Sequence, residues 1–253
     1  MLESFDFSTE DRQIALNMGL PYLFSYENGA YCSGPMLQAA EWFNLYLNPR
    51  GFSLAETKLS KEEACAFLKE HIPAMLGLAV SPHGKHAVVC VGVENGIEGA
   101  RYRFLNNKPQ NSPEPEIICL TEEELLPILS DSLAVAVLQK CRPQATDLKP
   151  YLQRSAETLS MLKQDIRNFC CKEQPPQALR AAQNTIFRAI LLDGVTMLGL
   201  LGNEDPLKAL QTIQRDFVAA LKENKTLILA DRLSLERFES AIDTYRDMIL
   251  AWK

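Results

Sequence analysis

The spacing of hydrophobic residues changes character near residue 143. Before this point, short segments with strand-like and helix-like patterns alternate. After it, apolar residues recur at steps of three and four, as on one face of an α-helix. The pattern predicts two domains, residues 1–142 and 143–253, joined through a proline-containing linker. The second domain is expected to be an all-α bundle, with helices over residues 148–171, 177–201, 206–224 and 233–252.

The first domain combines strand and helix patterns. An Asn-Gly dipeptide at 95–96, a hairpin signal, separates two of the strand-like segments. We expect an α+β fold in which the helices pack on an antiparallel sheet of about five strands. The predicted strands are residues 74–80, 86–93, 101–105, 116–120 and 133–139. The predicted helices are residues 8–18, 32–47 and 61–71, with residues 19–31 as a loop.

Charge and composition exclude several classes of partner. The net charge of −6 leaves no basic surplus to neutralise phosphates, so no nucleic-acid partner is expected. The first residues, MLESFDFSTEDRQ, lack the basic and apolar regions of a signal peptide. The longest apolar stretch, residues 189–201, is too short to span a bilayer. These features predict a cytoplasmic protein with no membrane partner.

The cysteines do not indicate a disulfide framework or a metal site. Seven cysteines occur at irregular spacing, and in the cytoplasm they are expected to be mostly free thiols. The sequence has no CxxC pair and only three histidines, so we expect no structural zinc and no cofactor.

One cysteine stands where a nucleophile would be activated. Cys32 precedes a predicted helix, whose unpaired N–H groups and dipole would stabilise a thiolate, and its own N–H could hold an oxyanion. His86 opens a predicted strand and could act as the base, although His83 is an equal candidate. Asn106, or its neighbour Asn107, follows the next strand and could orient the imidazole. The alternative is that Cys32 is a core residue and the asparagines form turns.

The order of these residues resembles the papain-like cysteine peptidase superfamily. The stretch AYCSGPMLQAAEWF resembles its nucleophile helix, and GKHAVVCVGVENG its histidine strand. RYRFLNNKP resembles the strand that carries the third residue. The spacing is closest to the bacterial double-glycine, bacteriocin-processing branch. The resemblance implies a papain-like fold from about residue 18 to residue 140.

The chain departs from this superfamily at the oxyanion position. The superfamily usually has a glutamine about six residues before the cysteine, and here that position is Tyr26. Asn28 could supply a side-chain amide in its place.

Three functions are consistent with these features. The first is a cysteine-dependent hydrolase of a peptide or amide bond, with an acyl-enzyme on Cys32. The second is an acyltransferase that moves an acyl group from a thioester to an amine, because papain-like acyltransferases also pair such a domain with a helical region. The third is a catalytically inactive papain-like binding module. The helical region is expected to cover the cleft or to mediate homodimerisation.

Overall fold

The structure, a computed structural model, describes residues 1, 10–37, 39–81, 84–97, 99–106, 115–171, 174–202, 204–223 and 232–252. The chain divides into two compact units. The sheet unit contains Phe43–Ala145, and the helical unit contains Thr9–Trp42 together with Thr146–Lys253. The division near Ala145 lies close to the predicted one. Residues 9–42, however, group with the helices and not with the sheet.

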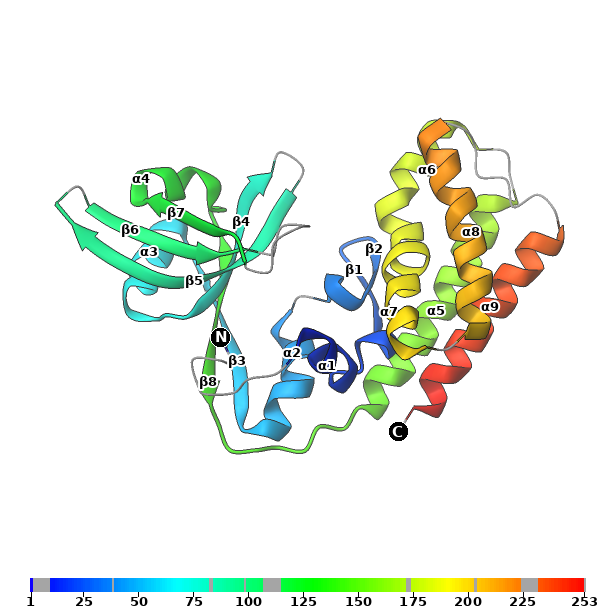
Figure 1. Cartoon of the computed structure of the whole chain (residues 1–253), viewed down its shortest axis with the longest axis horizontal. Helices are drawn as coiled ribbons and strands as arrows, with labels where there is room; N and C mark the ends of the chain where they lie inside the picture. Colours follow the sequence, from blue (N-terminus) through cyan, green and yellow to red (C-terminus); the bar gives the residue numbers. More distant parts are fainter. Residues whose placement is uncertain are drawn as a thin grey trace. The chain divides into compact units, whose positions relative to one another are not determined.

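The sheet unit is built on a six-stranded antiparallel sheet (Figure 1). The strand order is β3-β8-β4-β5-β6-β7. The five predicted strands are confirmed, and the sixth is a strand that the hydrophobic pattern misses. The strands are β3 (Phe52–Leu59), β4 (Ala74–Ser81), β5 (Gly84–Gly96), β6 (Gly99–Leu105), β7 (Ile117–Thr121) and β8 (Leu133–Lys140).

The missed strand is β3, at an edge of the sheet. Its first half alternates between buried and half-buried residues, but its second half, from Glu56, is largely exposed. Exposed charged side chains such as Glu56 and Lys58 suit an edge strand, because they disfavour pairing with another chain. The same charges remove the alternating pattern that would predict a strand.

Helix α3 (Lys61–Glu70) packs on the sheet, as predicted. Ser60 and Glu63 form a reciprocal capping box: the Ser60 hydroxyl accepts the Glu63 N–H, and the Glu63 carboxylate accepts the Ser60 N–H. The helix buries three side chains against the strands: Ala64, Cys65 and Leu68. The short helix α4 (Glu122–Leu125) completes the core.

The prediction that a helix begins at Cys32 is wrong. Cys32 lies inside strand β2 (Ala30–Ser33), which pairs with β1 (Phe24–Glu27) in a hairpin. The turn is Asn28-Gly29, with φ of +52° and +81°. Both central residues have positive φ, as in the type I′ turn that Asn-Gly favours. A 3₁₀ turn (Gly34–Met36) follows, and helix α2 begins only at Ala40 and ends at Leu47.

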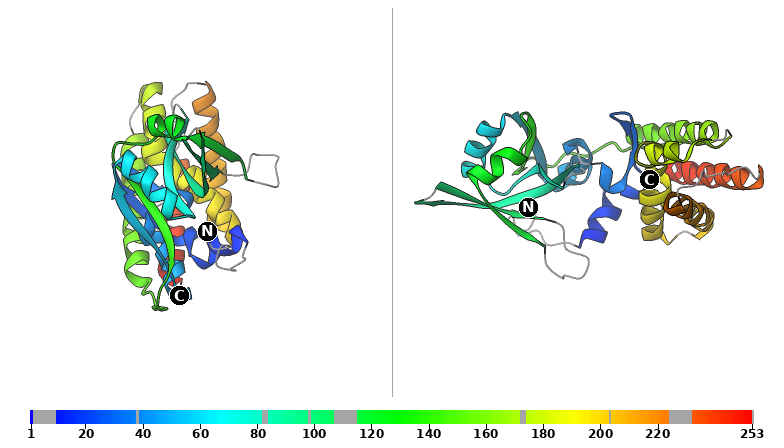
Figure 2. Two further views of the ribbon diagram at one scale, coloured as in Figure 1. Left: turned by 90° about the vertical axis from the view of Figure 1, so that its left-hand side faces the viewer. Right: turned by 90° about the horizontal axis from the view of Figure 1, so that it is seen from above.

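The helical unit contains the predicted C-terminal helices, which lie side by side (Figure 1; Figure 2). The helix predicted over residues 177–201 contains two π-helical segments, Gln183–Phe187 and Ala189–Gly194. The α-helices of the unit are α1 (Asp11–Asn17), α5 (Lys149–Cys170), α6 (Pro176–Ala182), α7 (Val195–Leu201), α8 (Glu204–Glu223) and α9 (Arg232–Ala251).

The β1–β2 hairpin belongs to this unit because its side chains complete the helical core. Phe24 and Tyr31 are buried in the same cluster as the apolar faces of α5, α8 and α9. The Ser155 hydroxyl of α5 accepts the Phe24 N–H at 2.9 Å. The Tyr31 hydroxyl donates to the Asp165 carboxylate at 2.6 Å. These contacts join segments more than one hundred residues apart in the sequence.

Within the described residues, no single helix is long and apolar enough to cross a membrane. Gln177–Phe187 and Ala189–Leu201 reach the required length and hydropathy only together, and the helix axis bends by 55° between them. The cytoplasmic compartment remains a prediction.

Candidate functional site

His86 and Asn106 lie on the same face of the six-stranded sheet. His86 pairs with the buried Leu78 of β4. It lies four residues before Cys90 on β5, so the two side chains point to the same face of the sheet. Cys90 in turn pairs with Phe104, and Asn106 follows Phe104 by two residues. Because every second side chain of a strand points to the same face, the imidazole and the amide share the core face.

The two residues also lie at the same end of neighbouring strands. Val89 pairs with Leu105, so the register puts Asn106 beside Val88, two residues from His86. Both side chains are half-buried. Asn106 thus lies directly after β6, the strand that follows and pairs with the strand of His86.

The backbone and side-chain amide of Asn106 are held by Glu116, the residue before β7. Its N–H donates to the Glu116 carbonyl oxygen at 2.8 Å. Its Nδ2 donates to Glu116 Oε2, also at 2.8 Å. Asn106 is therefore fixed by two hydrogen bonds to one residue, directly before the next strand. Two alternatives to these site residues, His83 and Asn107, lie outside the described residues.

Cys32 is in a different setting from the one predicted. Its residue is 7% exposed, and it lies in the middle of the hairpin, opposite Ser25. Burial is the main cause that raises the pKa of the Cys32 thiol, and the carboxylates of Glu27 and Asp193 raise it further. Arg188 and the N–H of Glu27 act in the opposite direction. The predicted lowering of this pKa by a helix N-terminus is wrong, because no helix begins at Cys32.

The predicted oxyanion residues occupy the outer part of the hairpin. Asn28 is exposed in the turn, three residues along the strand from the Ser25–Cys32 pair. Tyr26 is 50% exposed and its ring contacts that of Tyr31, with ring centroids 4.8 Å apart. The hairpin therefore places neither side chain beside the Cys32 sulfur.

The structure brings His86 and Asn106 together in the sheet unit, while Cys32 belongs to the helical unit. All three histidines of the sequence lie between residues 71 and 86, so the helical unit contains none. The charged neighbours of Cys32 within its own unit are Glu27, Arg188 and Asp193.

Arg188 and Asp193 are functional candidates that sequence reasoning misses. Asp193 interrupts the longest apolar stretch of the chain, and that isolated charge is the signal that could identify it. Their side chains form an ion pair, with Arg188 Nε 3.0 Å from Asp193 Oδ2. Burial raises the pKa of Asp193, and Arg188 opposes that shift.

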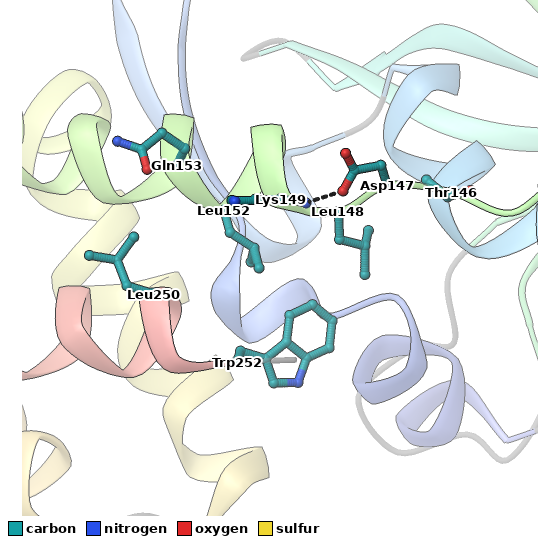
Figure 3. A pocket seen from close by; sticks show the side chains of 8 residues that line it. All are labelled: Thr146, Asp147, Leu148, Lys149, Leu152, Gln153, Leu250 and Trp252. Carbon is teal, nitrogen blue, oxygen red and sulfur yellow. Dashed lines mark hydrogen bonds between the residues drawn. The ribbon is translucent and has the colours of Figure 1, made fainter.

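A separate cleft of about 600 Å³ opens in the helical unit, between the start of α5 and the end of α9 (Figure 3). Its apolar wall consists of Leu148, Leu152, Leu250 and Trp252. Thr146, Asp147, Lys149 and Gln153 supply polar groups around that wall. The Asp147 carboxylate accepts the Lys149 N–H at 3.0 Å and so caps the start of α5 (Figure 3). The volume is within the range of small-molecule sites.

Within the part of the chain that the structure describes, no three His, Cys, Asp or Glu side chains are grouped to hold a metal ion. Comparison of the chain with protein-family models and with curated proteins finds no match.

Proposed function

We propose that this protein is a cysteine-dependent hydrolase that cleaves a peptide or amide bond through an acyl-enzyme on Cys32. The observation that supports the proposal is the placement of His86 and Asn106 on one face, at one end of neighbouring strands. An imidazole with an adjacent amide is the proton-transfer half of a papain-like site.

In the first step, the Cys32 sulfur attacks the carbonyl carbon of the substrate, and its proton passes to a general base, the role that the sequence pattern assigns to His86. The imidazolium then gives that proton to the leaving amine as the carbon–nitrogen bond breaks. Asn106, fixed through Glu116, orients the ring. Water, activated by the same imidazole, releases the acid and restores the thiol. If an amine replaces water as the acceptor, the same chemistry gives an acyltransferase.

Alkylation of the whole protein tests this role for Cys32. We expect iodoacetamide to label Cys32 near neutral pH faster than the buried Cys90 and Cys170, with each site quantified by peptide mass spectrometry. The His86→Ala variant should lower the Cys32 rate by at least about tenfold, because an imidazole partner lowers a thiol pKa by one unit or more.

His71→Ala is the matched control. His71 lies in the sheet unit like His86, but it is exposed and its ring stacks on Phe67, with centroids 4.0 Å apart. Its removal should leave the labelling rate unchanged. Equal rates in the wild type and in His86→Ala would reject both the hydrolase and the acyltransferase. If the thiol is activated, a thioester donor with and without an added amine separates these two.

The second candidate is a binding module without catalysis. It is favoured by the raised pKa of the buried Cys32 thiol and by the cleft at the end of the helical unit. Leucine side chains and an indole form the apolar wall of this cleft, and Lys149 supplies a cation at its polar side. Such a lining suits a small molecule with an apolar body and a carboxylate.

Tryptophan fluorescence tests this candidate, with octanoate as the probe. The chain has two tryptophans, and Trp42 is fully buried outside the cleft lining, so binding should change the emission of Trp252. We expect a saturable change in the wild type, a weaker one in Lys149→Gln, and none in Trp252→Phe. Octylamine serves as the charge control and should bind less tightly than octanoate. A change that does not saturate, or one that persists in Trp252→Phe, would reject this site.

A further inference from the structure

The ion pair between Arg188 and Asp193 depends on a π-helix. The two residues are five positions apart, which in an α-helix would turn their side chains well away from each other. Arg188 lies between two π-helical segments, and Asp193 lies within the second. The wider turn, with its i to i+5 repeat, brings Arg188 Nε to 3.0 Å from Asp193 Oδ2. Such insertions occur frequently at functional sites.

The same π-helix packs directly against the strand that carries Cys32. The hydroxyl of Ser33, the next residue, donates to the Ala189 carbonyl oxygen at 2.7 Å. At Gly34, an added Cβ would lie 2.8 Å from Cγ of Met197. Ala189 and Met197 thus contact two successive residues after Cys32. Asp193 lies midway between them in the sequence, about one helical turn from each.

The charges around Cys32 come from two directions. Glu27 projects from the neighbouring strand, on the same hairpin face as Cys32 and Ser25. It accepts hydrogen bonds from Ser25 Oγ at 2.6 Å and from Trp42 Nε1 at 3.3 Å, so its carboxylate is fixed. Arg188 and Asp193 approach from the π-helix. Among the described residues, these three are the charged groups close enough to act on the pKa of the thiol.

We propose that Arg188 and Asp193 are positioning residues that control the ionisation of Cys32, with the π-helix holding their opposite charges against the strand. Arg188 favours the thiolate, and Asp193 opposes Arg188 by favouring the protonated thiol. The pKa of Cys32 agrees in the direction of each effect: Arg188 lowers it and Asp193 raises it by less, while burial and then Glu27 are the main causes of its rise. The consequence for catalysis rests on the proposed function, but the effect on the thiol does not.

The test is the pH profile of Cys32 alkylation in the full-length protein, measured with iodoacetamide from about pH 6 to about pH 10. The midpoint of the profile reports ionisation, whereas the plateau at high pH reports access to the sulfur. Asp193→Asn should move the midpoint to lower pH and raise the rate below it by about three- to tenfold. Arg188→Gln should move the midpoint to higher pH.

Midpoint shifts of opposite sign in the two variants distinguish this proposal from a purely structural role of the ion pair. If the pair only held the helix in place, either variant would break it, and both would move the profile in the same direction. Asp243→Asn is the matched control, because it removes a carboxylate paired with Lys163 at 2.7 Å elsewhere in the unit. Its midpoint should equal that of the wild type. Shifts of one sign in both variants, or unchanged midpoints, would overturn the proposal. Opposite midpoint shifts together with a His86→Ala labelling rate equal to the wild type would leave the proposal standing while the hydrolase fails.

Discussion

At the scale of single residues, the hairpin turn decides which side chains face which way. Asn28 and Gly29 both adopt positive φ, at +52° and +81°. This two-residue turn fixes the register in which Ser25 pairs with Cys32. A shift of one residue would exchange the two faces of the hairpin. Phe24 and Tyr31 would then leave the helical core.

Gly29→Ala should therefore destabilise the helical unit by about 1 kcal/mol, the cost of a side chain in the left-handed region. No atom lies within 4 Å of the added methyl group, so this cost comes from the backbone alone. The change is measured by urea unfolding, followed through the helical circular dichroism signal.

Gly199→Ala is the control for this substitution. Gly199 also has open space around an added Cβ, but it lies in helix α7, where φ is negative. Alanine is the better helix former, so this variant should be equally stable or more stable by up to about 1 kcal/mol. Equal destabilisation by both variants would contradict the account of the turn.

At the scale of elements, the sequence predicts those segments whose signals are local. The apolar run HAVVCVGV is a strand, and Ser60 caps a helix, because the β-branched residues and the capping box act within a few residues. The Asn95-Gly96 signal predicts that β5 and β6 form a hairpin, although the structure pairs Asn95 with Ala100 and Gly96 with Gly99, so that the turn comes after this dipeptide. For that reason His86 and Asn106 could be placed on neighbouring strands from the sequence alone.

The segment around Cys32 shows where local signals fail. Gly34-Pro35 suggests the start of a helix. Residues 30–33 nevertheless form a strand, because β2 pairs with β1 and the hairpin packs on α5. The dipeptide Asn28-Gly29, which favours a hairpin turn, lies within the segment predicted as a loop. The charges that face Cys32 could not be predicted either. Arg188 and Asp193 are 156 and 161 residues after Cys32 in the sequence, and only a π-helix brings their side chains together.

At the scale of the whole molecule, the chain leaves and returns to the helical unit. Residues 9–42 and 146–253 form one unit, and the sheet unit lies between them in the sequence. Among the described residues, the buried cluster of the sheet contains none from 10–42, whereas that of the helices contains Phe24 and Tyr31. The two cores are therefore expected to respond separately to loss of the N-terminal segment.

Deletion of residues 10–42 tests this organisation. The helical unit would lose two buried aromatic side chains, each worth about 3–5 kcal/mol, a large part of the stability of a small domain. Hydrogen exchange with mass spectrometry should show lost protection in α5 and α9, since Ser155 and Asp165 lose their partners Phe24 and Tyr31. Protection of β4 and β5 should remain. A synthetic peptide of residues 10–42, added in excess, should restore protection to α5. Unchanged protection of α5 in the deleted chain would show that the hairpin is not part of the helical core.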